Sequence, residues 1–187
     1  MMDFHPLFIP GLKRWESYQQ KAYYDKGKER PIAIGFGTRE HNASGFEFTI
    51  DTVLRDENHA MELLLADIEK QYVPQLNSLF KKINFTAPTV GYYCGFLDAL
   101  YNRGYGRIEN SLAYDWLKHP ERPKCLATAA ACLSHSRAMD SILNPSGRDD
   151  FTALDTAWSD DHQREVIYPG LCDRRAFDTT LCMMERF

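Results

Sequence analysis

Residues 15–25, WESYQQKAYYD, and residues 31–38, PIAIGFGT, decide how this chain is expected to fold. The first stretch contains the end of an amphipathic helix that is predicted over residues 11–18, because Leu12, Trp15 and Tyr18 recur at a spacing of three. The second contains a β-prone run, residues 32–34, between a proline and two glycines, which is typical of a hairpin. A short helix that leads into a small sheet is therefore predicted near the N-terminus.

Two carboxylates stand at either end of the first stretch. Glu16 is predicted at the helix end beside Trp15 and Tyr18, where partial burial and the negative helix terminus disfavour ionisation. Asp25 follows nine residues later, at the entry to the hairpin, where solvent and hydrogen bonds favour the ionised form. Hydrolysis of a glycosidic bond needs one carboxylic acid as proton donor and one carboxylate that activates water or stabilises the cationic sugar. The contrast assigns the first role to Glu16 and the second to Asp25.

The segment after this hairpin is predicted to add a strand and then a long helix. Residues 46–50 are β-prone and are expected to complete a small sheet. The helix is expected to begin at Thr49 or Asp51, with acidic residues in its early turns, and to end before Pro74.

Most of the remaining chain is predicted to be helical. One helix opens with Thr86 as cap and Pro88 in its first turn and stops at Gly104, and another begins at Ser111. Further helices are expected at residues 126–133, 150–158 and 174–184. The predicted class is α+β: a small N-terminal β-hairpin lobe over residues 19–50, a larger helical lobe over residues 1–18 and 75–187, and a connecting helix over residues 51–74, all in one domain.

This pattern resembles the phage-type lysozymes, glycoside hydrolase family 24, the group of the T4-like and lambdoid endolysins. In that family a Glu near the end of the first helix is separated by eight intervening residues from an Asp that follows an A-Y or I-Y pair, and a T-I-G-x-G-H strand comes next. The matching positions are Glu16, Tyr24, Asp25, Ile34, Gly35 and Gly37. The resemblance implies a lysozyme-like fold, an acid role for Glu16 and a water-activating role for Asp25.

Two later blocks extend the resemblance over most of the chain. Residues 98–112, DALYNRGYGRIENSL, resemble the helix, glycine turn and N-S-L segment that borders the sugar cleft, which implies substrate contacts from Tyr101, Asn102 and Ser111. Residues 170–181, GLCDRRAFDTTL, resemble a G-L-x-x-R-R-x-x-E-x-x-L helix with Asp178 in place of the Glu, and its arginines are expected to be structural. Among the aromatic residues, Phe36 and Tyr101 are expected to face the cleft.

Two positions depart from the family pattern. The threonine whose hydroxyl helps to hold the attacking water falls on Ala33, and a methyl group cannot hydrogen-bond water. The histidine that closes the strand is replaced by Thr38. Three outcomes remain open: another side chain, for instance from residues 28–30, orients the water; Asp25 suffices alone at a reduced rate; or the protein binds glycan without turning it over.

The expected function is therefore that of a muramidase, which hydrolyses the β-1,4 bond between N-acetylmuramic acid and N-acetylglucosamine in peptidoglycan. The alternative is a peptidoglycan-binding protein with weak or no turnover. The first ten residues lack the basic start and apolar run of a secretory signal, so we expect synthesis in the cytoplasm and action at the cell wall after holin release or delivery by a secretion system. A monomer is expected, with glycan strands and an inhibitor or delivery protein as partners.

Composition excludes several other classes. A net charge of −4 does not suit a sequence-independent nucleic-acid binder, and no stretch approaches the roughly 20 apolar residues of a membrane-spanning helix. The five cysteines form no C-x-x-C pair and are expected to be free, packed thiols.

Two catalytic alternatives and any cofactor are also not favoured. The metal-ligand fragments, His59 with Glu62 and residues 160–162, lack the paired histidines of H-E-x-x-H, so no metal or cofactor is expected. Residues 134–136, Ser-His-Ser, are adjacent in the chain, do not face one another on a helix and stand in no G-x-S-x-G elbow.

Overall fold

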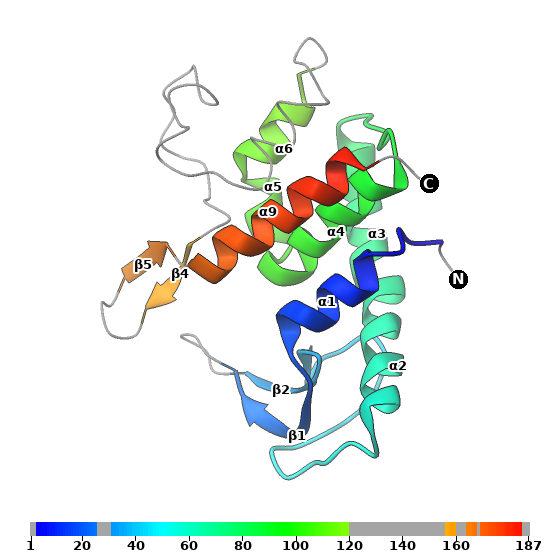
Figure 1. Ribbon diagram of the computed structural model, residues 1–187, viewed down its shortest axis with the longest axis vertical. Helices are drawn as coiled ribbons and strands as arrows, with labels where there is room; N and C mark the ends of the chain where they lie inside the picture. Colours follow the sequence, from blue (N-terminus) through cyan, green and yellow to red (C-terminus); the bar gives the residue numbers. More distant parts are fainter. Residues whose placement is uncertain (1–2, 26–30, 120–155, 160–163, 168, 185–187) are drawn as a thin grey trace.

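The computed structural model describes residues 3–25, 31–119, 156–159, 164–167 and 169–184, and within 156–184 the side chains of 173, 174, 176–182 and 184. The fold is α+β: a helical majority with a small three-stranded antiparallel sheet, as predicted. Figure 1 shows this sheet at one end of the molecule and most of the helices at the other. The predicted division into lobes stays a prediction.

Helix α1, Phe8–Glu16, leads directly into the sheet. It begins three residues earlier than predicted and ends at Glu16, because Ser17 adopts a φ of 53°, which no α-helix continues. Its buried face consists of Phe8, Gly11 and Leu12. The predicted helix end at the candidate acid is therefore confirmed.

The sheet has the order β1-β2-β3, with β1 at Gln19–Tyr24, β2 at Ile32–Gly35 and β3 at Thr38–Arg39. The predicted strand at residues 46–50 is wrong. Asn42 donates from Nδ2 to the carbonyl of Phe46 at 2.7 Å, and the ring of Phe46 packs on Phe48 and His59, so this apolar run is held by a loop instead of a ladder.

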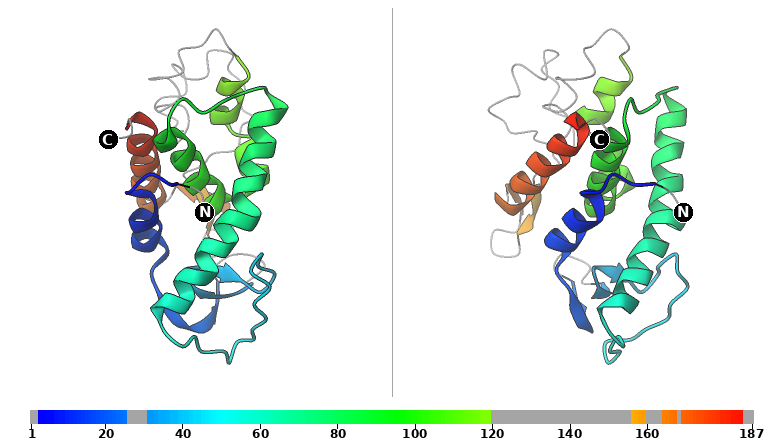
Figure 2. Two further views of the ribbon diagram at one scale, coloured as in Figure 1. Left: turned by 90° about the vertical axis from the view of Figure 1, so that its right-hand side faces the viewer. Right: turned by 45° about the vertical axis from the view of Figure 1, so that its right-hand side comes forward.

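A long helical column connects the sheet to the remaining helices. It consists of α2, Glu57–Asp67, a π-helical turn η1, Ile68–Tyr72, and α3, Val73–Lys82, and Figure 2 shows it as one continuous helical run that leads away from the sheet. The predicted start is wrong, because Asp56 caps the helix by accepting from the backbone N–H of His59 at 2.8 Å.

The predicted end of this column before Pro74 is also wrong. Proline lacks the N–H of a normal helical hydrogen bond and its ring clashes with the preceding turn. Here the π-helical turn precedes it, and Pro74 occupies the first turn of α3, where an N–H is not needed. The column therefore continues past the proline.

The remaining helices include α4, Val90–Arg103, α5, Tyr105–Glu109, α6, Leu112–Leu117, and α9, Pro169–Met183. Helix α4 starts at the cap Thr89, three residues after the predicted cap, and ends at Gly104 as predicted. Residues 126–133 lie outside the described residues, and of the predicted helix 150–158 the described part belongs to strand β4, Thr156–Ser159, which pairs with β5, Arg164–Ile167.

Helices α4 and α9 pack closely across the core (Figure 1). A Cβ on Gly91 would lie 2.3 Å from the carbonyl oxygen of Leu181, and a Cβ on Gly95 would lie 2.6 Å from Sγ of Cys182. Cys94 and Cys182 are both buried free thiols in this core. Glycine is therefore required where the two backbones approach.

We expect Gly91→Ala to lower the free energy of unfolding by roughly 1–3 kcal/mol or more, because the added methyl meets backbone that cannot move without separating the helices. Urea denaturation followed by circular dichroism measures this change. Gly106→Ala is the matched control, since a Cβ there meets nothing within 4 Å and alanine favours the helix by roughly 0.5–1 kcal/mol. Equal destabilisation by both substitutions would contradict the packing argument.

Candidate active site

Glu16 projects from the last residue of α1 into a partly buried position. Its side chain is 19% exposed, and Oε1 accepts a hydrogen bond from Nη1 of Arg174 in α9. The positive φ of Ser17 turns the chain away immediately afterwards, so that the carboxylate lies between the helices and the sheet. A residue of the first helix and one of the last described helix thus meet at this point.

Arg174 is buried and belongs to a network of charges. Its Nε donates to Oδ2 of Asp98 at 2.9 Å and its Nη2 donates to Oδ1 at 2.8 Å, a two-pronged contact with a carboxylate that is fully buried on α4. Asp178, one turn further along α9, is also fully buried and its charge acts on Arg174. Guanidinium geometry suits such fork-like pairing, which removes much of the penalty for burying the cation.

Burial and the charge network together shift the pKa of Glu16. Burial raises the pKa of Glu16 above its ordinary value, and the neighbouring charge of Arg174 opposes that rise without cancelling it. The negative charges of Asp98 and Asp25 add to the rise. Asp98 engages two further donors of Arg174, so the cation is shared between two carboxylates. The raised pKa is the property that a proton donor at neutral pH requires.

The geometry also decides which oxygen of Glu16 carries the proton. A guanidinium group donates hydrogen bonds and accepts none, so the proton of neutral Glu16 resides on Oε2, away from Arg174. A Cβ on Gly37 would lie 3.3 Å from this oxygen and 3.4 Å from the hydroxyl of Tyr101. With φ at 91°, Gly37 leaves this space free for a reacting group.

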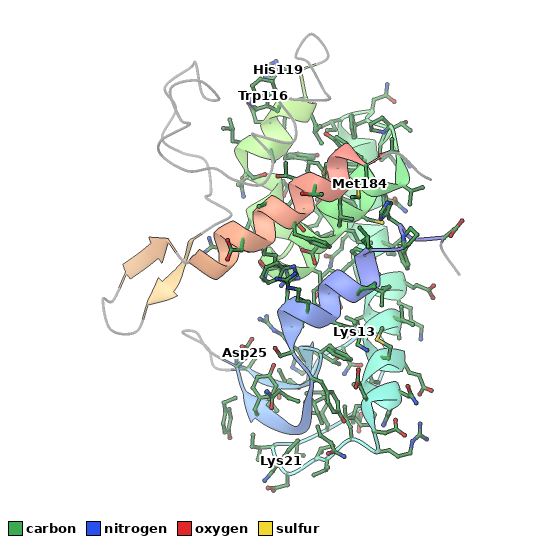
Figure 3. All side chains as sticks on the ribbon, viewed as in Figure 1. Lys13, Lys21, Asp25, Trp116, His119 and Met184 are labelled. Atoms are coloured by element: carbon green, nitrogen blue, oxygen red, sulfur yellow. The ribbon has the colours of Figure 1, made fainter. Side chains whose placement is uncertain are left out.

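Asp25 follows the last residue of β1 and lies at the edge of the sheet (Figure 3). Its backbone N–H donates to the carbonyl of Pro31 at 2.8 Å, which continues the pairing of β1 with β2. Its side chain is 34% exposed, and Oδ2 accepts from Nη2 of Arg39 at 3.2 Å. Asp25 is therefore a more solvated carboxylate than Glu16, and its charge reaches Glu16.

A polar cleft of about 450 Å³ borders these two side chains. Glu16 and Asp25 do not line it, but Gly37 beside Glu16 and Arg39 beside Asp25 both do. The full set of lining residues is Pro31, Gly37, Arg39, Glu40, His41, Asn42, Asp67, Gln71, Tyr72 and Tyr101. Its size falls in the range of small-molecule sites, and its many hydrogen-bonding groups suit a polyhydroxylated ligand.

Of the predicted substrate contacts, Tyr101 lies in the cleft. Its hydroxyl donates to the carbonyl of Phe36 at 2.7 Å, and its ring packs edge-on against Tyr72. This bond ties α4 to the turn between β2 and β3, so Tyr101 also fixes the position of Gly37. Asn102, the next residue, is half-buried on α4.

Two predicted contacts are corrected. Phe36 is 1% exposed and packs on Tyr18, because it lies between two glycines of positive φ and the alternation of the strand does not extend to it. Ser111 is also buried: its hydroxyl donates to the carbonyl of Ile108 at 2.7 Å and accepts from the N–H of Tyr114 at 3.2 Å. It caps α6, and both hydrogen bonds leave it unavailable to a sugar.

Sequence reasoning missed several residues of the site. Arg174 was expected to be structural, yet it contacts Glu16 directly, and its partner Asp98 was not singled out. Tyr23 also belongs here, because burial and the charges of Asp25 and Glu16 raise its pKa to about 12. The paired arginines at residues 174–175 were the available signal for the network, whereas Asp98 had none.

The departures from the family pattern are both in the sheet. Ala33 is 1% exposed in β2, and Thr38 is buried in β3 near Asp67, a buried carboxylate that accepts from the N–H of Ala43 at 2.9 Å. Residues 28–30, which were considered as a source of water-positioning groups, lie outside the described residues.

The other candidate sites gain no support within the described residues. His59 packs edge-on against Phe46, and no group of three or more metal-ligating side chains occurs in the described part of the chain. Residues 134–136 and 160–162 are not described. In the same part of the chain, no helix combines the length and apolar character needed to cross a bilayer.

The arrangement of a small sheet, a long helical column and a helical body defines a lysozyme-like fold, and solved structures share it. An endolysin from Escherichia coli O157:H7 phage FAHEc1 matches with a TM-score of 0.65 at 18% identity, covering 97% of this chain and 94% of the endolysin. The muramidase domain of SpmX from Asticaccaulis excentricus matches with a TM-score of 0.64 at 16% identity, covering 98% and 99%. A point mutant of P22 lysozyme matches with a TM-score of 0.60 at 21% identity, covering 98% and 100%.

No protein-family profile matches the chain, and no curated protein matches it. At these identities the structural matches establish the fold, while the expected membership of glycoside hydrolase family 24 stays a prediction.

We expect Asp98→Asn to lower the pKa of Glu16, because it removes a negative charge that raises this pKa and leaves Arg174 freer to stabilise the ionised form. The carboxyl ¹³C shift of Glu16, followed by NMR across pH, measures the change without any substrate. Asp115→Asn, the same charge change on α6, should leave the titration unchanged. An unaltered or higher pKa in Asp98→Asn would show that the network does not set the ionisation of Glu16.

Proposed function

We propose that this protein is a muramidase that hydrolyses the β-1,4 bond between N-acetylmuramic acid and N-acetylglucosamine in bacterial peptidoglycan. The observation that carries the proposal is the pair formed by Glu16 and Asp25, one carboxyl desolvated with a raised pKa and one more exposed, beside a single polar cleft. Fold similarity to an endolysin, a muramidase domain and a lysozyme supports the same substrate class.

In the proposed reaction Glu16 donates the proton on Oε2 to the glycosidic oxygen as the bond breaks. Gly37 leaves room for that oxygen to approach, and Tyr101 borders the same space. Arg174 stays bonded to Oε1 and stabilises the carboxylate that forms when the proton leaves. The residues therefore favour the neutral acid before the transfer and accommodate its conjugate base afterwards.

Asp25 acts on the other reacting partner. Its carboxylate accepts a proton from the attacking water, or stabilises the positive charge that develops on the sugar ring. The sugar rings occupy the cleft beside Tyr101, and Asn102 remains a proposed contact next to it. We propose action at the cell wall, reached by holin release or a secretion system, and a monomeric protein that an inhibitor or delivery protein binds.

A second candidate function is glycan binding with little or no turnover. The observation that favours it is Ala33, which offers no hydrogen bond on the sheet that carries Asp25. Loss of one such bond corresponds to roughly 1–3 kcal/mol, or about 10- to 100-fold in rate, which slows a reaction without abolishing it. Sedimentation with purified cell wall without release of reducing sugars would identify the binder.

We expect Glu16→Gln to reduce the release of reducing sugars from purified peptidoglycan by about 10²- to 10⁴-fold, because the amide cannot donate the required proton. Mass analysis of the soluble fragments identifies the cleaved bond. Glu57→Gln is the matched control, since Glu57 is a half-exposed glutamate paired with Lys13 at the start of α2.

The pH dependence adds a second criterion. Activity should fall as the pH rises through the raised pKa of Glu16, where the acid loses its proton. Parental activity in Glu16→Gln would remove this residue from the mechanism, whereas equal loss in Glu57→Gln would point to a general defect.

A further inference from the structure

Four side chains share one face of the sheet at the candidate site. In the register of the strands, Tyr23 of β1 is opposite Ala33 of β2, and Ala33 is opposite Arg39 of β3. Residues directly opposite one another in antiparallel strands project to the same face, as do residues two apart along a strand. Asp25, two residues after Tyr23, therefore projects to the face that carries Ala33 and Arg39.

Arg39 reaches Asp25 across the middle strand. Its Nη2 lies 3.2 Å from Oδ2 of Asp25, although β2 separates β3 from β1. The residue between them on the shared face is Ala33, whose side chain is a single methyl group. The long side chain of Arg39 on β3 thus extends past Ala33 on β2 and contacts the carboxylate of Asp25 beside β1.

We propose that Arg39 is a positioning residue for Asp25 and that the small side chain of Ala33 provides the path for its guanidinium group. This inference rests on the proposed function, because it assigns the group that orients the water-activating carboxylate. The bond from Nη2 engages Oδ2 of Asp25 and so restrains the orientation of this carboxylate. Arg39 also lines the cleft, and its guanidinium group presents its donors in a planar fork that suits a carboxylate.

The interaction is suited to orientation more than to stability. Arg39 is 63% exposed and Asp25 is 34% exposed, and exposed ion pairs contribute little to the free energy of unfolding. Removal of the guanidinium should therefore leave the fold intact and weaken the restraint on the orientation of the Asp25 side chain. Removal of the Arg39 guanidinium should therefore lower kcat, because misalignment of a reacting group slows the chemical step.

A cycle of substitutions tests the coupling between positions 39 and 33. Arg39→Ala should lower kcat on purified peptidoglycan by about 10-fold or more while KM changes less than about twofold. Arg39→Lys should recover part of the loss, since an ammonium group donates to Oδ2 but without the planar fork. Ala33→Thr introduces a hydroxyl on the same face, so in the Arg39→Ala background it should restore kcat at least about threefold, more than in the parental background.

A second measurement needs no substrate. The order of the Asp25 side chain, followed by ¹³Cβ relaxation, should fall in Arg39→Ala and return in Arg39→Lys. Lys21→Ala, a substitution of an exposed cation on β1, should change neither this order nor kcat.

The possible failures are distinguishable. An active parental protein whose kcat is unchanged in Arg39→Ala, or whose change lies in KM alone, overturns the role of Arg39 and leaves the proposed function standing. Strictly additive effects of the two substitutions overturn the coupling to Ala33. A parental protein that releases no sugar overturns the proposed function and this role with it, whatever the order of Asp25.

Discussion

The buried contact of Arg174 with Asp98 and Glu16 is the interaction on which the rest of the site depends. It joins α9, α4 and α1, elements separated in the chain by 76 and 158 residues at the contacting positions. A buried cation is tolerated only when its donors are satisfied with good geometry, so these three helices have to dock together. Gly91 and Gly95 allow α9 to approach α4 closely enough for this contact. The environment of Glu16 is therefore formed by three helices and not by the first helix alone.

The two carboxylates owe their difference to the two kinds of structure that present them. Glu16 ends a helix and enters a space enclosed by other helices, so desolvation dominates its ionisation. Asp25 ends an edge strand of a small sheet, and its side chain stays in contact with solvent and with an exposed cation. A buried helix end and a more exposed sheet edge thus meet beside one cleft, and the proposed acid and base roles depend on this contrast.

Local signals in the sequence predicted the elements that local interactions determine. The helix end at Glu16, the strand at residues 32–35 and the cap at Ser111 all follow from nearby residues. Long-range features were not predictable in this way. Asp98 has the sequence context of an ordinary helix-surface aspartate, and only the contact with Arg174 of α9 distinguishes it. The turn η1, which accommodates Pro74, has no recognisable sequence pattern. The prediction that Phe36 faces the cleft failed for a local reason. The two flanking glycines have positive φ, so side chains no longer alternate between the two faces of the strand there.

The substitution at position 33 illustrates why a single departure from a motif is a weak basis for inferring lost activity. On a sheet, residues directly opposite one another on neighbouring strands project to the same face. A hydrogen-bonding group at that face can therefore come from any of these strands. A methyl at position 33 removes one donor and at the same time opens the path by which Arg39 meets Asp25. Three solved structures with this fold share 16–21% identity with the chain, so the fold persists through wide sequence change. The buried helical network holds Glu16 through side chains remote from the sheet, so in the proposed mechanism the means of holding Asp25 can differ without disturbing Glu16.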